Sequence, residues 1–508
     1  MSSTFGGLNI VVRGLAAQQV SLDTVGHNVS NANTTGYSRQ NVNLTTTITQ
    51  SVFGARGENQ IGTGVNIESI IRARDTFIDK QMWKESASLG YGQKATDTLG
   101  RIEGVFSEPS DTGIQTAMDK FWTAWQTLAT NASDDGTRTA VRQRGVELVD
   151  AIQHAAQQLS DMVEDTNSVI DITVNNLNQL SSQVYDLNRQ IVTIEAGGMD
   201  HANDLRDRRD VLVDQMAKLT SINVTQDKYG NYNIMSTGVP LVDGVGYQKL
   251  ETTTTKDADY GFNVRNVVVA GSEQPLSFAN GELRGLLEMR DSVADVNSYD
   301  GIKGYIKKLD KMSQFLLQDF NAVHKAGVGT GVDNATGLNF TGINFFGTTG
   351  IDYNNSTQFT PSAISMGWIS ELKVNQDLFD SGNGLSKIAA KTTAAQGNAS
   401  GDNAVNLANS MKIDTTTTLG GATLDSFYNS VIGALGVQTQ SATSLTANQT
   451  TLVSQITNWR ESVSGVNIDE EMSNMIRFQK GYAAAARVLT SMDEILDKLI
   501  NSTGVVGR

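Results

Sequence analysis

The sequence predicts a mainly α-helical fold with inserted β segments: terminal coiled-coil helices, a long helical-bundle rod domain and small β-rich inserted domains. Two observations predict this class. Apolar residues recur in alternating steps of three and four at both ends and through long central stretches, which is the spacing of one helix face. Between these stretches, short segments alternate apolar and polar residues and are separated by Gly-Asn or Asp-Gly turns, as strands are.

The first predicted helix covers residues 8–29 and has one narrow apolar seam, which only Gln18 interrupts. After it, residues 31–36 (Asn-Ala-Asn-Thr-Thr-Gly) supply turn formers, so the chain should leave the helix there. A helix of this length with few charges is marginal alone and needs a partner. The seam consists of Leu8, Val11, Leu15, Leu22, Val25 and Val29.

The partner is predicted at the opposite end of the chain, where the same stepping runs without a break. Asn467 and Glu470 give this helix a capped, acidic start, and Gly504 lies just past its expected end. We expect the two seams to form an assembly interface. The C-terminal seam consists of Met475, Phe478, Tyr482, Ala485, Leu489, Met492, Leu496 and Leu499.

The region between the termini alternates helical and strand-like stretches. Residues 41–80 read as short hairpins separated by glycines. Residues 76–219 are helical, with a heptad from Val163 to Ile194 and a second helix that opens near Ala202. The heptad positions are Val163, Ile170, Leu177, Leu180, Val184, Leu187, Ile191 and Ile194, followed in the second helix by Leu205, Leu212 and Leu219.

Beyond residue 220 a β subdomain is predicted near 222–290, a helix over 305–324, and a small exposed β-rich domain over 327–400. A last heptad stretch is expected over 424–459, and its seam would include Phe427, Val431, Ala434, Leu445 and Leu452. The predicted domains are 1–70 with 465–508, a terminal coiled-coil assembly domain; 71–326 with 401–464, the helical rod domain; and 327–400.

Composition excludes several classes of function. The chain has 508 residues, no cysteine and a net charge of −15. Without cysteine it has no disulfide, thiolate nucleophile or cysteine metal site. The acidic balance argues against a nucleic-acid surface. No apolar segment is long enough to span a membrane, and we expect no cleaved secretory signal, because residues 1–12 carry no Lys or Arg and their apolar run is short.

No motif indicates catalysis, a cofactor or a metal. The four histidines, His27, His154, His201 and His324, lack a metal-ligand spacing. The charged segment 204–210 pairs Asp204 with Arg208 and Arg206 with Asp210 at helical spacing, so we interpret it as an exposed, salt-bridged helix face. Trp122 and Trp125 should be bundle core or a subunit contact.

Both ends of the chain resemble a known family. Residues 14–23, 26–31 and 33–40 resemble the N-terminal signature of the bacterial flagellar rod, hook and junction proteins, and residues 464–472 and 477–482 resemble their C-terminal signature. Gly-Tyr-Ser-Arg-Gln and segment 202–210 are similar to the junction members. The family motif positions are Asn31, Asn33, Thr34, Gly36 and Tyr37.

The resemblance implies a structural adaptor rather than an enzyme. Its identical copies would assemble as a ring, with hook protein below and a second hook-associated junction protein, then filament, above. It would be exported through the flagellar type III channel without a cleaved signal and lie outside the cell in the flagellum, and an export chaperone would bind the C-terminal helix. The terminal helices would fold on polymerisation, since their seams have no monomeric core to fill.

Two alternatives remain open at this point. The chain could be a hook or rod subunit of the same family, although the long helical stretches count against this because those relatives are mostly β between their termini. A flagellum-associated enzyme is a weaker alternative, because no catalytic constellation is visible.

Overall fold

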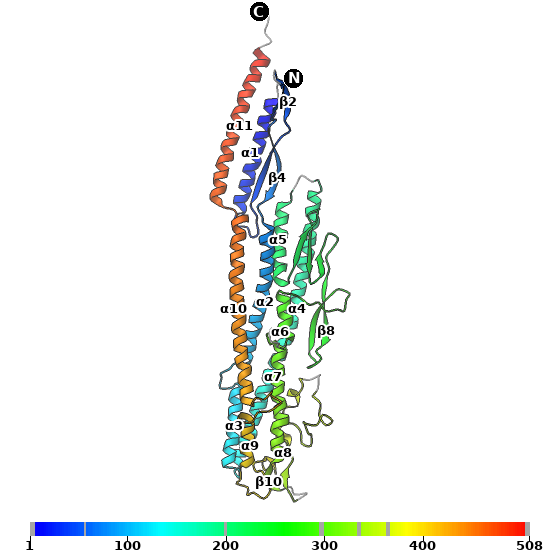
Figure 1. Ribbon diagram of the computed structural model, residues 1–508, viewed down its shortest axis with the longest axis vertical. Coiled ribbons are helices and arrows are strands. Elements are labelled where there is room, and N and C mark those ends of the chain that lie inside the picture. Colours follow the sequence, from blue (N-terminus) through cyan, green and yellow to red (C-terminus); the bar gives the residue numbers. More distant parts are fainter. Residues whose placement is uncertain are drawn as a thin grey trace, which may run out of the picture. The chain divides into compact units, whose positions relative to one another are not determined.

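The computed structural model describes residues 6–54, 57–197, 201–293, 299–332, 337–361 and 366–502. Helices dominate these residues, and the strands form small antiparallel sheets of two or three members. The predicted mainly α fold with β insertions is therefore confirmed. Figure 1 shows the course of the chain through these elements.

The chain divides into two compact units that interleave along the sequence. Unit 1 contains Met1–Leu89, Asn176–Lys249 and Gln449–Arg508, and unit 2 contains Gly90–Asn175 and Leu250–Asn448. Helices α2 (Thr76–Phe106), α4 (Asp135–Glu195) and α10 (Leu424–Ser464) contribute residues to both units. This grouping differs from the predicted domain boundaries, which placed all three helices in the helical rod domain.

In unit 1 the terminal helices α1 (Gly6–Asn31) and α11 (Ile468–Ser502) lie side by side (Figure 1). Gly7 meets Met492, Gln18 meets Gly481, and Asn28 meets Glu471, so the pair is antiparallel. The predicted partnership of the two ends is confirmed. The polar break at Gln18 is accommodated because Gly481 has no side chain opposite it.

The start of the last helix is capped as the sequence predicts. The Asn467 side-chain oxygen accepts hydrogen bonds from the backbone N–H groups of Asp469 (3.0 Å) and Glu470 (3.3 Å). The acidic first turn favours the positive end of the helix dipole. The expected stop at Gly504 lies outside the described residues.

Two antiparallel strand pairs follow α1, where the sequence predicts short hairpins. Strand β1 (Gln40–Thr46) pairs antiparallel with β4 (Val65–Arg72), with a register shift after Asn43, and β2 (Gln50–Gly54) pairs with β3 (Gly57–Ile61). The β1–β4 ribbon packs against α1. It brings the end of β4 close to the place where α1 ends, which positions the site described below.

Unit 1 also contains the end of α4, helix α5 (Asn203–Leu219) and a three-stranded sheet of β5 (Asn223–Gln226), β6 (Tyr232–Ser236) and β7 (Val239–Val242). The predicted heptad of α4 is buried as expected, except that Leu187 is half-buried and Ile194 is exposed. The sheet corresponds to the first half of the predicted β subdomain.

Unit 2 is a helical bundle around an aromatic core. Five rings pack with centroids about 5–6 Å apart: Phe121, Trp125, Phe320, Phe345 and Phe346. The prediction of Trp125 as bundle core is confirmed. The elements confined to this unit are α3 (Ile114–Thr130), β8 (Leu250–Lys256), β9 (Asn263–Val269), α6 (Glu282–Asp291), α7 (Ile302–Phe315), a π-helical turn (Leu316–Phe320), α8 (Asn321–Ala326), β10 (Val328–Val332), β11 (Asn339–Thr341), 3-10 turns at Ile369–Glu371, Gln376–Phe379 and Leu385–Lys387, and α9 (Asp402–Lys412).

Residues 327–400 differ from the expected exposed β-rich domain. Within the described part of this segment, strands β10 and β11 are short. Phe345, Phe346, Tyr353 and Trp368 are buried in the core of unit 2, whereas Val332, Leu338 and Phe379 are exposed. The buried Arg138 fixes the segment, because its Nη1 donates to the carbonyl oxygens of Leu385 (3.1 Å) and Ile388 (2.8 Å). Burial lowers the Arg138 pKa to about 10, although the charge of nearby Asp135 partly opposes this shift.

The predicted seam of α10 is partly wrong. Val431 is buried, but Leu445 and Leu452 are each 44% exposed. The buried stripe runs instead in steps of seven through Tyr428, Leu435, Ala442, Gln449 and Ile456. The apolar periodicity of this helix fits two stripes. The stripe that contains Gln449 is the buried one, and the buried amide is satisfied there because Gln449 Nε2 donates to the Glu85 carbonyl oxygen, 3.1 Å away. None of the described helices is long and apolar enough to cross a membrane.

Candidate functional site

The site lies in unit 1, where α1 ends and the family-like motif turns toward β1. Asn28 sits at its centre and is buried. Its Nδ2 donates to the Gln40 carbonyl oxygen (2.9 Å) and to Glu471 Oε2 (3.1 Å), and its Oδ1 accepts from Gln40 N–H (2.9 Å) and Tyr37 Oη–H (2.7 Å). One amide therefore uses its full hydrogen-bonding capacity to join α1, the turn and α11.

Arg39 adds charge to the same junction. Its guanidinium makes a bidentate contact with the exposed Glu470 (3.0 Å for both bonds) and an ion pair with the buried Glu471 (Nε to Oε1, 2.8 Å). Its backbone N–H donates to the Ser464 carbonyl oxygen, 2.8 Å away. The two acids at the start of α11 therefore hold the start of β1, in geometry that is specific to arginine.

The charged segment of α5 faces this junction. Ser38 N–H donates to Asp207 Oδ2 (2.9 Å), and Gln40 Nε2 donates to Asp204 Oδ1 (3.0 Å). Of the residues 204–210, Asp207, Arg209 and Asp210 are buried. Our interpretation of this segment as an exposed, self-paired face is wrong.

The partners of the segment come from elsewhere in the chain. Arg206 pairs with Glu195 through two hydrogen bonds. Asp210 pairs with Arg72, the last residue of β4, and with Arg74, two residues beyond it. Arg209 stacks on the Tyr232 ring at 3.6 Å and donates to the Asn188 side-chain oxygen and the Gly230 carbonyl, both 2.8 Å away. The local i,i+4 pairs are not made because these buried partners compete for the same groups.

Two arginines and two aspartates form the charged centre of the site. Arg72 Nη1 lies 2.7 Å from both Asp207 Oδ1 and Asp210 Oδ2, and Arg74 Nη1 lies 3.2 Å from Asp210 Oδ2. Burial alone would raise the pKa of Asp210, but the two guanidiniums hold it below its usual value. Burial likewise opposes the charge of Arg72, and Asp210 and Asp207 keep its pKa raised. Asp210, Arg72 and Arg74 are therefore charged at neutral pH.

The network continues to the helices that leave the site. Arg74 makes two hydrogen bonds to Asp79 at the start of α2 (2.8 and 3.1 Å). Arg460 near the end of α10 reaches both Asp79 (3.2 Å) and Asp214 of α5 (2.7 Å), and Trp83 Nε1 donates to Asp214 (2.7 Å). A continuous set of charge contacts thus joins β4, α2, α5 and α10.

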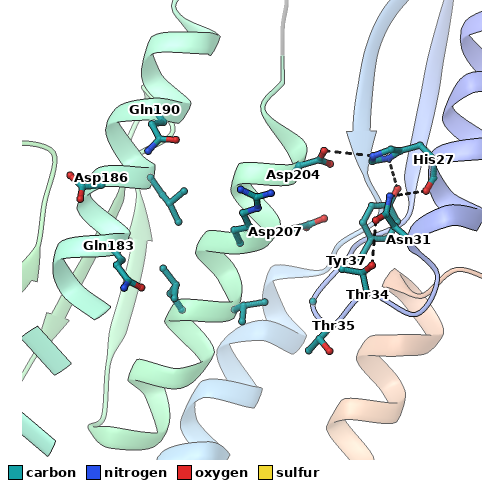
Figure 2. Close-up of a pocket in the computed structure, with 15 residues that line it drawn as sticks. His27, Asn31, Thr34, Thr35, Tyr37, Gln183, Asp186, Gln190, Asp204 and Asp207 are labelled. Carbon is teal, nitrogen blue, oxygen red and sulfur yellow. Dashed lines mark hydrogen bonds and ion pairs between the residues drawn. The ribbon is translucent and has the colours of Figure 1, made fainter. Parts of the chain in front are cut away.

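A pocket of about 580 Å³ opens beside this network. The turn that follows α1 forms one wall and α4 and α5 form the others; Asp204, at the start of α5, faces His27 (Figure 2). His27 Nδ1 lies 3.0 Å from Tyr37 Oη, and His27 Nε2 lies 3.6 Å from Asp204 Oδ2. Burial, with the nearby charges of Asp204, Asp207 and Glu471, raises the Tyr37 pKa well above its usual range, so the phenol stays a hydrogen-bond donor.

Gly36 sets the approach of this turn to α5. Its φ of 80° lies in the left-handed region, and a Cβ there would overlap Val211 Cγ2. Both constraints require glycine. This gives a structural reason for one motif residue that the sequence singled out.

The other predicted residues divide between this site and the helix pair. Asn31, Thr34, Gly36 and Tyr37 line the pocket, whereas Asn33 is exposed and outside it. The predicted seam residues of α1 and α11 are half-buried, apart from three. Val25 is fully buried, and Tyr482 and Leu499 are 40% and 48% exposed.

Sequence reasoning did not single out the residues that carry the charge network. Asn28, Arg39, Gln40 and Glu471 lie inside the signature stretches, but nothing local marks them as partners. Arg72 and Arg74 lie more than a hundred residues from Asp207 and Asp210, so no spacing rule could have paired them.

The site is structural, because its side chains connect segments of the chain to one another. Within the described residues, no group of three or more His, Asp or Glu side chains could hold a metal ion. Most of the charged and amide groups named above contact one another, and together they connect α1, the motif turn, β4, α2, α5, α10 and α11. Such a network costs desolvation energy and specifies one arrangement of those segments.

Comparisons with known proteins place the chain in the class of flagellar axial proteins. Residues 8–37 match the family model "Flagella basal body rod protein", residues 461–502 match "Flagellar basal body rod FlgEFG protein C-terminal", and residues 99–346 match "Flagellar hook-associated protein FlgK helical domain".

The relatives narrow this class. The chain is 32% identical to flagellar hook-associated protein 1 of Bacillus subtilis over 100% of both chains, and 27% identical to that of Escherichia coli over 97% of this chain and 99% of the relative. The solved flagellar hook junction protein FlgK of Burkholderia pseudomallei has the same fold, with a TM-score of 0.58 at 18% identity; the match covers 76% of this chain and all of that one. The chain belongs to the flagellar hook-associated protein 1 family.

The family assignment confirms the resemblance seen at the two ends. It identifies a structural component of the bacterial flagellum, and none of the matched families is catalytic. The hook or rod alternative is less well supported, because the long central match is to the hook-associated helical domain.

Proposed function

We propose that this chain joins the flagellar hook to the filament as a ring of identical copies. The observation that carries the proposal is the apolar surface left open on the terminal helix pair. Ile476, Val488 and Ile495 of α11 are each about half exposed although their helix is already paired with α1. Half-buried aliphatic side chains gain roughly 1 kcal/mol each when an assembly covers the rest.

The same surface links folding to assembly. Alone, the helix pair has little apolar area to offset the ordering entropy of its two long segments. In a ring, neighbouring copies would cover the open faces. The predicted seam residues would then belong to an interface that is completed only on polymerisation.

The proposed neighbours are hook protein on one side and the second hook-associated junction protein on the other. The chain would reach them through the flagellar type III channel, without a cleaved signal. An export chaperone would hold the C-terminal helix until assembly, because an apolar helix in transit needs cover. These partners come from the family resemblance, and the names of the relatives mention only the hook.

Electron micrographs of a strain that lacks this gene test the function. We expect hooks without filaments and filament protein in the medium, and a plasmid copy of the chain should restore filaments. Normal filaments on the hooks of the deletion strain would contradict the proposal.

A further inference from the structure

We propose that the pocket beside the motif turn binds the outward face of α11 from a second copy of this chain. The inference rests on the proposed ring and names the two surfaces that would meet. Both surfaces belong to unit 1 of their own copy.

The pocket offers an acidic rim and an apolar floor. Asp186 of α4 and Asp204 of α5 are exposed at its edge, and Leu187, Val211 and Leu212 contribute apolar side chains. Figure 2 shows Gln183, Asp186 and Gln190 along one wall, opposite the turn with Thr34 and Tyr37. Three carboxylates line the pocket, but Asp207 is paired with Arg72, and Asp204 accepts from Gln40 and lies 3.6 Å from His27. Asp186 is therefore the carboxylate that a basic side chain of another copy would meet. Its chemistry fits a helix face that carries apolar and basic side chains.

The middle of α11 presents such a face. Between Glu471 and Asp493 the helix carries three basic residues and no carboxylate. At 100° per residue, Met472, Ile476, Lys480, Ala483 and Arg487 lie along one stripe, on the side nearly opposite the seam that faces α1. All five are exposed, and within the described residues neither Lys480 nor Arg487 pairs with a carboxylate.

A copy cannot fill its own pocket with this stripe. Lys480 lies nine residues beyond Glu471, which is about 13 Å along the helix from the junction where the pocket opens. The stripe also points away from α1, whose end borders the pocket. The contact must therefore be intermolecular.

Two different surfaces of one chain then meet in a head-to-tail manner. Such a heterologous contact closes into a ring or continues as a helix, depending on the rotation between copies. It would also place the motif turn at every contact between copies. The exposed hydroxyls of Thr34 and Thr35 in the motif turn would then contact the neighbouring copy. The charge network within a single chain gives these hydroxyls no role.

Charge reversal of the purified full chain tests the contact. Asp186→Lys and Lys480→Glu should each weaken concentration-dependent self-association in sedimentation velocity by about tenfold, because like charges would face each other. The double variant Asp186→Lys/Lys480→Glu should restore it. Lys84→Glu, at an exposed lysine of α2 outside both surfaces, is the matched control and should have no effect.

Cross-linking locates the contact, since the chain has no cysteine of its own. Copies with Gln190→Cys at the pocket and copies with Ala483→Cys on the stripe should form disulfide-linked dimers when mixed. Each cysteine variant alone should form few disulfide-linked dimers. Circular dichroism of each variant checks that it is folded.

The outcomes separate this proposal from the proposed function. If both single reversals self-associate like the wild type, or if mixed cysteine variants cross-link no better than each alone, the second-copy contact is wrong. If self-association is unchanged but Asp186→Lys fails to restore filaments in the deletion strain, the pocket serves another flagellar protein and the proposal is again overturned. The proposed function fails only if wild-type chain is dispensable for filaments.

Discussion

The buried charge centre gives the sharpest prediction, and Asp210 is its key residue. The Asp210 side chain is inaccessible to solvent and contacts Arg72 at 2.7 Å and Arg74 at 3.2 Å. Asp210→Asn keeps the shape and removes the charge, so two buried guanidiniums lose a shared counterion.

The expected loss of stability depends on the ion pairs that Arg72 and Arg74 keep in the variant. Arg72 retains Asp207 and Arg74 retains Asp79, so the loss should lie at the low end of the range for a broken buried pair, about 3 kcal/mol. For a domain of roughly 150–250 residues this corresponds to a melting temperature lower by about 6–12 °C.

Differential scanning calorimetry at pH 7 measures the effect. Asp23→Asn, at an exposed aspartate of α1, is the control and should change the melting temperature by less than about 2 °C. The folded-state pKa of Asp210 is depressed, so its contribution is present above about pH 4 and is lost as pH falls through the folded pKa. The variant should therefore show a smaller loss of stability on acidification. A melting temperature equal to that of Asp23→Asn would refute the assigned role.

Three further predictions concern other parts of the chain. Gly36→Ala should destabilise by about 1–2 kcal/mol from its positive φ, plus the overlap with Val211, which Val211→Ala should relieve; urea unfolding of the single and double variants checks this. Burial raises the Asp310 pKa to about 6, so ionisation of Asp310 lowers the stability of the folded chain as pH rises from about 4 to 6. Asp310→Asn should remove this pH dependence and stabilise the chain at pH 7.5 by about 2–3 kcal/mol. A variant that is less stable than the wild type at pH 7.5 would count against this prediction. Limited proteolysis of dilute monomer should trim roughly the first 40–70 and last 40 residues and spare the rest, whereas full resistance of both ends would argue against assembly-coupled folding.

The sequence predicted the elements whose signals are local and periodic. The seams of the terminal helices, the Asn467 cap and the heptad of α4 depend on nearest neighbours along one helix, so the pattern alone determines them. The family motif also led to Gly36 and Tyr37, both of which line the pocket.

What the sequence could not predict depends on contacts between distant segments. Asp207 and Asp210 looked like one face of a solvated helix because their partners, Arg72 and Arg74, come from the end of a strand far away in the chain. In α10 the stripe through Leu445 and Leu452 was as periodic as the buried one, and only packing against α2 near Glu85 decides between them. Segment 327–400 looked exposed because its composition is polar, although Phe345, Phe346, Tyr353 and Trp368 belong to the core.

The central claim is that the terminal helices serve assembly, and one pair of variants tests it most directly. Leu489 is half-buried in the seam of α11, and Leu180 is buried in α4. Leu489→Asp should leave the melting temperature of the purified monomer nearly unchanged while hooks stay without filaments, because this half-buried position is fully desolvated only when neighbouring copies cover it. Leu180→Asp should lower the monomer's melting temperature directly. An equal loss of monomer stability in both variants would contradict the account.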